Sequence, residues 1–118
     1  MASLPLPLGE ALLFAELLPT SVQGMSSRVL ARGTGGNLTL FAFAAGQGLS
    51  EHMTPHEAMV IVLEGRLTLT IGGAVVAAQA GTVVRLPARV PHAVSAPEPA
   101  RMLLLLLHQA EAAIAPQP

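Results

Sequence analysis

The stretch EHMTPHEAMVIVLEG, residues 51–65, decides how this sequence folds. It begins with a polar cluster that holds His52, His56 and two glutamates. The apolar run AMVIVL follows directly and predicts a strand that is buried on both faces. Gly65 then marks a reversal of the chain. Histidines at the entrance to a buried strand either bind a metal ion inside a barrel or only form the polar edge of a turn.

Short strands are expected throughout the rest of the chain. The segment RLTLTI alternates apolar and polar residues and precedes Gly72-Gly73, a two-residue hairpin signal. Pro87 and Pro91 divide the segment 83–96 into two strand pieces. The other predicted strands cover 26–32, 38–44, 58–65, 66–71, 74–79 and 101–107. Short strands separated by Gly and Pro, with no helix between them, predict an all-β sandwich or closed barrel.

The length of 118 residues suits one domain. We expect a single domain over residues 1–118, with a barrel core at about 26–107. Residues 1–18 are expected to form an arm with a short helix over 9–18 that ends before Pro19. Residues 108–118 are expected to be a tail.

Composition excludes several classes of function. The net charge is −1 with no basic cluster, which argues against a nucleic-acid partner. Cysteine is absent, which excludes disulfides and Cys-ligated metals. The N-terminus lacks the basic region of a signal peptide, and the longest apolar run is too short to span a bilayer, so we expect a cytoplasmic protein without a membrane partner.

The chain is 52% hydrophobic and only 11% charged, which suggests that an oligomer buries part of its surface. We expect a homodimer in which the leucine-rich last strand and the apolar N-terminal arm pair across a two-fold axis.

Two histidines follow turn glycines at similar spacings. Gly46 is followed after five residues by His52, and Gly81 is followed after five residues by Pro87 and then by His92. In both segments a glycine precedes a short strand and an imidazole lies near the end of the segment. Imidazoles from two strands of one small barrel can converge on its interior and bind a metal ion there.

These residues resemble the two motifs of the cupin superfamily, G-x5-H-x-H-x3/4-E-x6-G and G-x5-P-x-G-x2-H-x3-N. The resemblance covers residues 37 to 107, and the hairpin GRLTLTIGGAVVAAQAG between the motifs is also typical of cupins. It implies a small jelly-roll, or double-stranded β-helix, barrel. It also implies one Fe, Mn, Ni, Zn or Cu ion bound by three histidines and a glutamate.

The sequence departs from the family's motifs at four positions, which hold Thr54, Ala58, Arg89 and Ala96. Only His52 and His92 therefore carry over as metal ligands in register.

His56 is the natural third ligand, and Glu57, one residue from the family's glutamate position, is a further candidate. We predict a divalent metal ion, Zn, Ni, Fe or Mn, at His52, His56 and His92. His108 is expected at a terminus or interface rather than at the metal.

The expected ligand is a small, mostly apolar molecule in the barrel, in a pocket lined by Thr54, Met59, Arg89 and Met102. Three hypotheses of function remain open. The protein is a metal-dependent enzyme such as an oxygenase or isomerase, a non-catalytic binding or sensing module, or a structural barrel whose histidines only form hydrogen bonds. The sequence identifies no catalytic residue and does not decide whether the protein is an enzyme.

Overall fold

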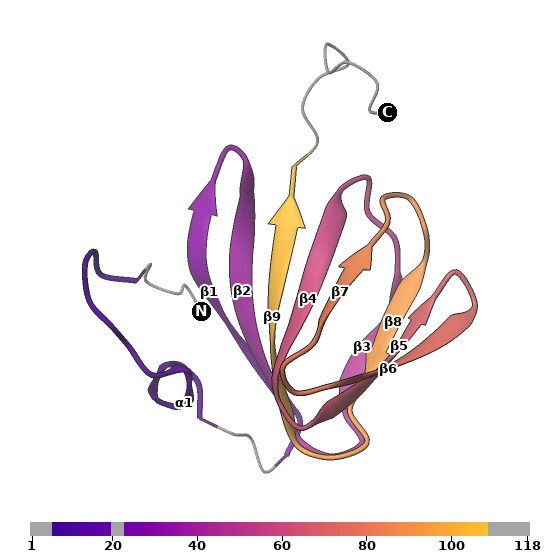
Figure 1. The fold of residues 1–118 in the computed structure, drawn as a ribbon, viewed down its shortest axis with the longest axis horizontal. Helices are drawn as coiled ribbons and strands as arrows, with labels where there is room; N and C mark the ends of the chain where they lie inside the picture. Colours follow the sequence, from indigo (N-terminus) through magenta and orange to yellow (C-terminus); the bar gives the residue numbers. More distant parts are fainter. Residues whose placement is uncertain (1–5, 20–22, 109–118) are drawn as a thin grey trace.

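The computed structural model describes residues 6–19 and 23–108. These residues form two antiparallel sheets that face each other and one short helix, so the predicted all-β, cupin-type barrel is confirmed (Figure 1). Within the described residues, no helix is long and apolar enough to cross a membrane.

The larger sheet has five strands in the order β1-β2-β9-β4-β7. Its central strand, β9 (Ala100–Leu107), pairs with β2 on one side and β4 on the other. The remaining strands are β1 (Met25–Gly33), β2 (Gly36–Phe43), β4 (Glu57–Glu64) and β7 (Val83–Leu86). The leucine-rich last strand therefore has no open edge, and pairing of a second copy along it, as the dimer prediction assumed, is not available.

The smaller sheet has four strands in the order β3-β8-β5-β6. They are β3 (Gly48–His52), β8 (His92–Ser95), β5 (Arg66–Ile71) and β6 (Ala74–Gln79). The β5–β6 hairpin follows the predicted residue ranges, with the Gly72-Gly73 turn between its strands. Strand β3 was expected only as a short strand between Gly46 and His52, without bounds, because its residues are mostly polar and lack an alternating pattern.

The space between the sheets is filled mostly by aliphatic side chains, together with the stacked rings of Phe41 and Phe43. Side chains pointing inward alternate along each strand with side chains on the outer face. The buried members of this core are Phe43, Ala58, Val60, Val62, Leu67, Leu69, Ala78, Leu86, Val94, Ala96, Ala100 and Met102. Met102, a predicted pocket residue, is fully buried in this packed interior.

A second apolar cluster lies on the outer face of the larger sheet. Leu30, Leu40 and Leu103 are buried there beneath residues of the N-terminal segment, including Leu6 and Leu17. The N-terminal segment thus covers part of a sheet face that would otherwise be exposed to water (Figure 1).

The helix α1 (Phe14–Leu17) is a single turn and not the longer helix predicted over residues 9–18. Its N-cap, Leu13, makes no side-chain capping bond, so the first backbone N–H groups lack the acceptor that a Ser or Asp would supply. Good helix-forming residues alone do not sustain a short helix.

Candidate functional site

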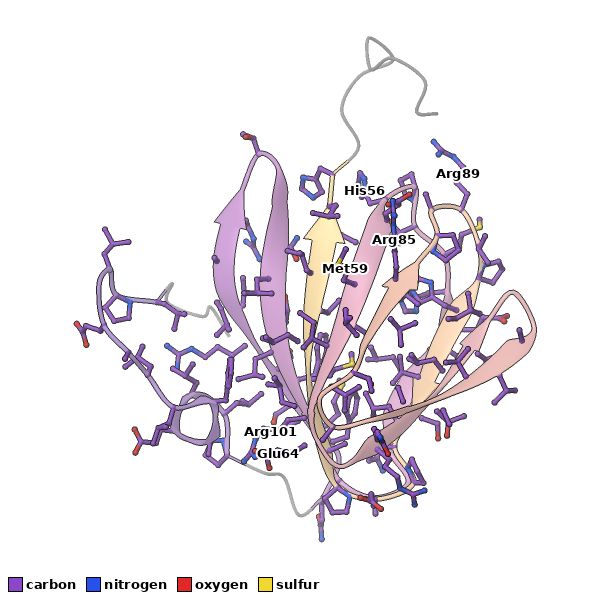
Figure 2. The ribbon with its side chains drawn as sticks, in the orientation of Figure 1. His56, Met59, Glu64, Arg85, Arg89 and Arg101 are labelled. Carbon is purple, nitrogen blue, oxygen red and sulfur yellow. The ribbon has the colours of Figure 1, made fainter. Side chains whose placement is uncertain are left out.

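All four histidines lie at one end of the barrel, which we call the histidine end. Strands β3 and β9 end there, and β4 and β8 begin there. The backbone N–H of Arg89 donates to the Thr54 carbonyl across 2.8 Å, which ties the β7–β8 loop to the β3–β4 loop. Figure 2 shows His56 and Arg89 at this end, and Glu64 and Arg101 at the opposite end.

His52 and His92 meet across the pairing of β3 with β8. They are direct partners in the ladder, and their ring centroids lie 4.4 Å apart with the ring planes 72° from parallel. His92 is 4% exposed and shares the inner face of β8 with Val94, whereas His52 is exposed. The pair therefore extends from the barrel interior to solvent.

A β-bulge explains why His52 reaches this position. Leu49 pairs with Val94 and His52 pairs with His92, so β3 carries one residue more than β8 between these two pairs. Without the extra residue, strict alternation would put Glu51 on the inner face beside Leu49. The bulge shifts the alternation and aims His52 at His92 instead.

Hydrogen bonds determine which ring nitrogen of each histidine accepts a proton or a metal. The Nδ1 of His52 lies 2.9 Å from the carbonyl oxygen of Ser50, and the Nδ1 of His92 lies 3.3 Å from that of Val90. A carbonyl only accepts, so each Nδ1 carries the hydrogen and each Nε2 carries the lone pair. Both rings thus have the tautomer that binds a metal through Nε2.

The pKa of His92 is lowered from its ordinary value. Burial of the ring, which disfavours the charged form, is the main cause, and the neighbouring charge of His52 adds to it. The hydrogen bond to the Val90 carbonyl acts weakly in the opposite direction. His92 is therefore neutral near pH 7, which is the form that ligates metals.

The remaining predicted ligands are not brought to this pair. His56 lies beside His108, with ring centroids 4.7 Å apart. Glu57 points to the outer face, where its carboxylate accepts from Arg85 at 2.6 Å. The inner position next to it belongs to Ala58, which is 1% exposed.

The residues predicted to line one ligand pocket do not lie together. Met59 lies between Ala58 and Val60, which both point inward, so Met59 is on the outer face of β4 (Figure 2). Thr54 is half-buried in the β3–β4 loop, and its Oγ1 accepts from the His56 backbone N–H at 3.1 Å.

Arg89 is exposed and has a φ of 61°, the left-handed conformation that the family's glycine adopts without strain. Of the predicted pocket residues, Thr54 and Arg89 remain at the histidine end.

These donors fit only part of the metal site that the family motif implies. Two rings bound to one ion at about 2.1 Å through Nε2, at right angles around it, have centroids about 4.5 Å apart. The observed 4.4 Å separation of His52 and His92 matches this value. Across residues 6–19 and 23–108, however, no three His or Glu side chains are grouped to hold one metal ion. The structure thus offers two imidazoles and no carboxylate.

Comparison with known proteins gives a consistent result. The family model of the cupin domain matches residues 39–107. The fold is similar to that of a conserved protein of unknown function from Streptococcus pyogenes, with a TM-score of 0.84, 26% identity, and coverage of 93% of this chain and 96% of that chain. Comparison with curated proteins finds no match.

Two further solved structures are similar. A cupin superfamily protein from Desulfitobacterium hafniense has a TM-score of 0.82 and 24% identity, over 92% of this chain and 100% of that chain. A cupin 2 conserved barrel domain protein from Leptotrichia buccalis has a TM-score of 0.76 and 30% identity, over 80% of this chain and 46% of that chain.

Proposed function

We propose, since this chain belongs to the cupin family, that it is a binding module whose His52 and His92 hold a divalent transition-metal ion at the histidine end of the barrel. The observation that carries the proposal is the cross-strand pair of imidazoles, 4.4 Å apart, with both Nδ1 atoms directed at backbone carbonyls. Rings oriented in this way need little rearrangement to bind an ion.

The donor set favours some metals over others. Imidazole nitrogen suits Zn²⁺, Ni²⁺ and Fe²⁺, whereas Mn²⁺ prefers carboxylate and water oxygen. Because Ala58 stands where the family has its glutamate, the pair offers nitrogen alone. We therefore favour Zn²⁺, Ni²⁺ or Fe²⁺ over Mn²⁺.

We propose that a small ligand completes the coordination. An ion held by two protein donors keeps open positions and acts as a Lewis acid toward a ligand oxygen or nitrogen. Ile71, which pairs with His92, is apolar and packs against the core, so the surroundings of the ion favour a ligand with an apolar part. Arg89 is the cation of the β7–β8 loop, which lies at the histidine end, and it favours an anionic donor group.

Binding without turnover suits the interior better than catalysis. Among the described residues, the buried polar or charged side chains are His92 and Arg101, and Arg101 binds on the outer face. The core between the sheets therefore supplies no carboxylate as a general acid or base. Oxygen uptake or isomerisation by the metal-loaded protein would favour the alternative, a metal-dependent enzyme.

A homodimer remains part of the proposal, with a changed interface. Because β9 is central in its sheet, a second copy would pack on outward side chains and not along the strand edge. Half-buried Met59, Leu105 and Leu107 lie on that outer face, beyond the part that the N-terminal segment covers. Analytical ultracentrifugation of the wild type and of Leu105→Glu tests this interface, and a monomeric wild type at high concentration would exclude it.

Metal titration by calorimetry tests the binding function. Tag-free protein that has been stripped of metal is titrated with Zn²⁺ or Ni²⁺ beside His52→Gln, His92→Gln and the double variant. Each single variant should lose roughly tenfold or more in affinity, because one of two protein donors is removed. A double variant that binds as tightly as the wild type would remove the metal site from this pair.

A further inference from the structure

We propose that His56 and His108 form a second metal-binding site, independent of the pair His52–His92 and of the function proposed for it. The four histidines of the chain form two pairs, and this one has ring centroids 4.7 Å apart with the ring planes 42° from parallel. His108 comes from the end of β9, and nothing in the sequence motifs assigned it a role.

The sheet itself aligns the second pair. Glu57 and Leu107 are the last paired residues at this end of the β4–β9 ladder. The next position on each strand is His56 on one side and His108 on the other, so the same antiparallel register sets them opposite each other. Directly opposed side chains in antiparallel strands have Cβ atoms about 5 Å apart, which suits two donors to one ion.

Backbone contacts hold both residues in place. The His108 backbone N–H donates to the Gly35 carbonyl at 2.9 Å, and its ring Nδ1 lies 3.2 Å from the Thr34 carbonyl. Its Nδ1 therefore carries the hydrogen, and its Nε2 carries the lone pair. The His56 backbone N–H donates to Thr54 Oγ1 at 3.1 Å. The β1–β2 turn thus orients the His108 ring, and the β3–β4 loop holds the backbone of His56.

The chemistry indicates which ions bind. The ring centroids lie 4.7 Å apart, which allows one nitrogen of each ring to reach the same ion at about 2.1 Å. Both rings offer imidazole nitrogen, which Cu²⁺ binds more tightly than Ni²⁺ or Zn²⁺. Glu57, the nearest carboxylate along the chain, is engaged by Arg85, so water or an external donor completes the coordination.

Copper titration in a background without the first pair tests this site. The His52→Gln/His92→Gln protein, full-length and tag-free, is titrated with Cu²⁺ and followed by electron paramagnetic resonance. We expect one bound equivalent whose hyperfine pattern reports two imidazole nitrogens. Adding His108→Gln, or separately His56→Gln, should weaken binding by roughly tenfold or more and remove one nitrogen from the pattern. Circular dichroism checks that each variant keeps the fold.

Two results would overturn the proposal: no stoichiometric Cu²⁺ binding in that background, or binding that neither added substitution weakens. The reverse background, His56→Gln/His108→Gln, reports on His52 and His92 alone. A failure of one site is thereby distinguished from a failure of the other.

Discussion

At the scale of the residue, His52 and His92 share the same local hydrogen-bond arrangement. In each, the ring Nδ1 reaches the carbonyl of the residue two positions earlier, Ser50 for His52 and Val90 for His92. A strand that presents its own backbone carbonyl to the ring sets the tautomer without help from another side chain. The imidazoles are thereby ready to bind through Nε2 even though the family's carboxylate is missing.

The lowered pKa of His92 predicts how stability depends on pH. In the unfolded chain the ring binds its proton below about pH 6.5, but the folded protein resists protonation until a lower pH. The unfolded state therefore binds more protons in that window. The contribution of His92 to stability is complete above pH 6.5 and decreases as the pH falls through the window below it.

Metal-free protein tests this dependence. Urea unfolding followed by circular dichroism, which suits a chain without Trp or Tyr, should give a smaller free energy of unfolding at pH 5.5 than at pH 7.5. His92→Gln should reduce that difference. An imidazole titration by nuclear magnetic resonance that places the pKa of His92 above its ordinary value would contradict the account.

Arg89 supplies a second residue-scale prediction, because it occupies a left-handed conformation with a φ of 61°. A side chain with a Cβ is strained there by about 1 kcal/mol, and a β-branched side chain by more. Arg89→Gly should be as stable as the wild type or more stable by up to about 1 kcal/mol, and Arg89→Val should be less stable by about 1 kcal/mol or more. Arg89→Ala is the control, since it removes the guanidinium and keeps the Cβ. A Val variant as stable as the Gly variant would show that the loop relaxes.

At the scale of the element, the close approach of β3 to β8 makes the first histidine pair. A Cβ on Gly48 would collide with the Val94 carbonyl group, whose carbon would lie 2.9 Å away. Gly48→Ala should therefore destabilise the protein by about 1 to 3 kcal/mol and weaken metal binding at His52–His92 by displacing β3. Gly35→Ala is the matched control, because its Cβ would meet nothing within 4 Å. Equal metal affinity in the Gly48 and Gly35 variants would show that this pairing does not position the site.

A buried arginine attaches the N-terminal segment to the larger sheet. Arg101, which is 5% exposed, donates from Nε to the Leu18 carbonyl at 3.0 Å and from Nη1 to the Glu64 carboxylate. Arg101→Ala leaves the carbonyl and the carboxylate without this donor and should cost about 2 to 3 kcal/mol of unfolding free energy. Arg66→Ala is the control, because its ion pair with Glu98 is solvent-exposed and should contribute about 0.5 kcal/mol.

Thermal and urea unfolding of Arg101→Ala and Arg66→Ala measure how much stability each arginine contributes. Limited proteolysis should cut the N-terminal segment faster in Arg101→Ala alone. If both arginine variants lose the same small amount of stability, the contact does not attach the segment.

The sequence predicted the bounds of some strands and not those of others. The strands of the β5–β6 hairpin were predicted at their observed residues, since alternation and the Gly72-Gly73 turn are both local signals. Strand β3 was expected after Gly46 but without bounds, because it is a polar edge strand that pairs only with β8. The β3 bulge was not predicted, because a register shift becomes visible only against the partner strand.

At the scale of the whole molecule, the sequence predicted the barrel and the meeting of His52 with His92, but not the place of His56. His52 and His92 are brought together as their motif positions suggested. His56 is instead set beside His108 by the β4–β9 ladder, a pairing between strands far apart in the chain that no local pattern encodes. Apolar periodicity reports which face of a strand is buried, but not which strand lies next to it.

The barrel has the four histidines at one end and, at the other, the buried Arg101 bound to Leu18 and Glu64. The two sheets supply one histidine pair each, from β3–β8 and from β4–β9. The interior between them is closed by aliphatic side chains. We therefore expect substitutions of Arg101 or Glu64 at the opposite end to change stability without changing metal affinity.

Anomalous X-ray diffraction from crystals soaked in Ni²⁺ or Zn²⁺ at neutral pH tests whether His52 and His92 together hold one metal ion. We expect an anomalous peak about 2.1 Å from the Nε2 atoms of both His52 and His92, and no such peak in His92→Gln crystals. Fully occupied metal elsewhere on the protein, with no density between these two rings, would contradict it.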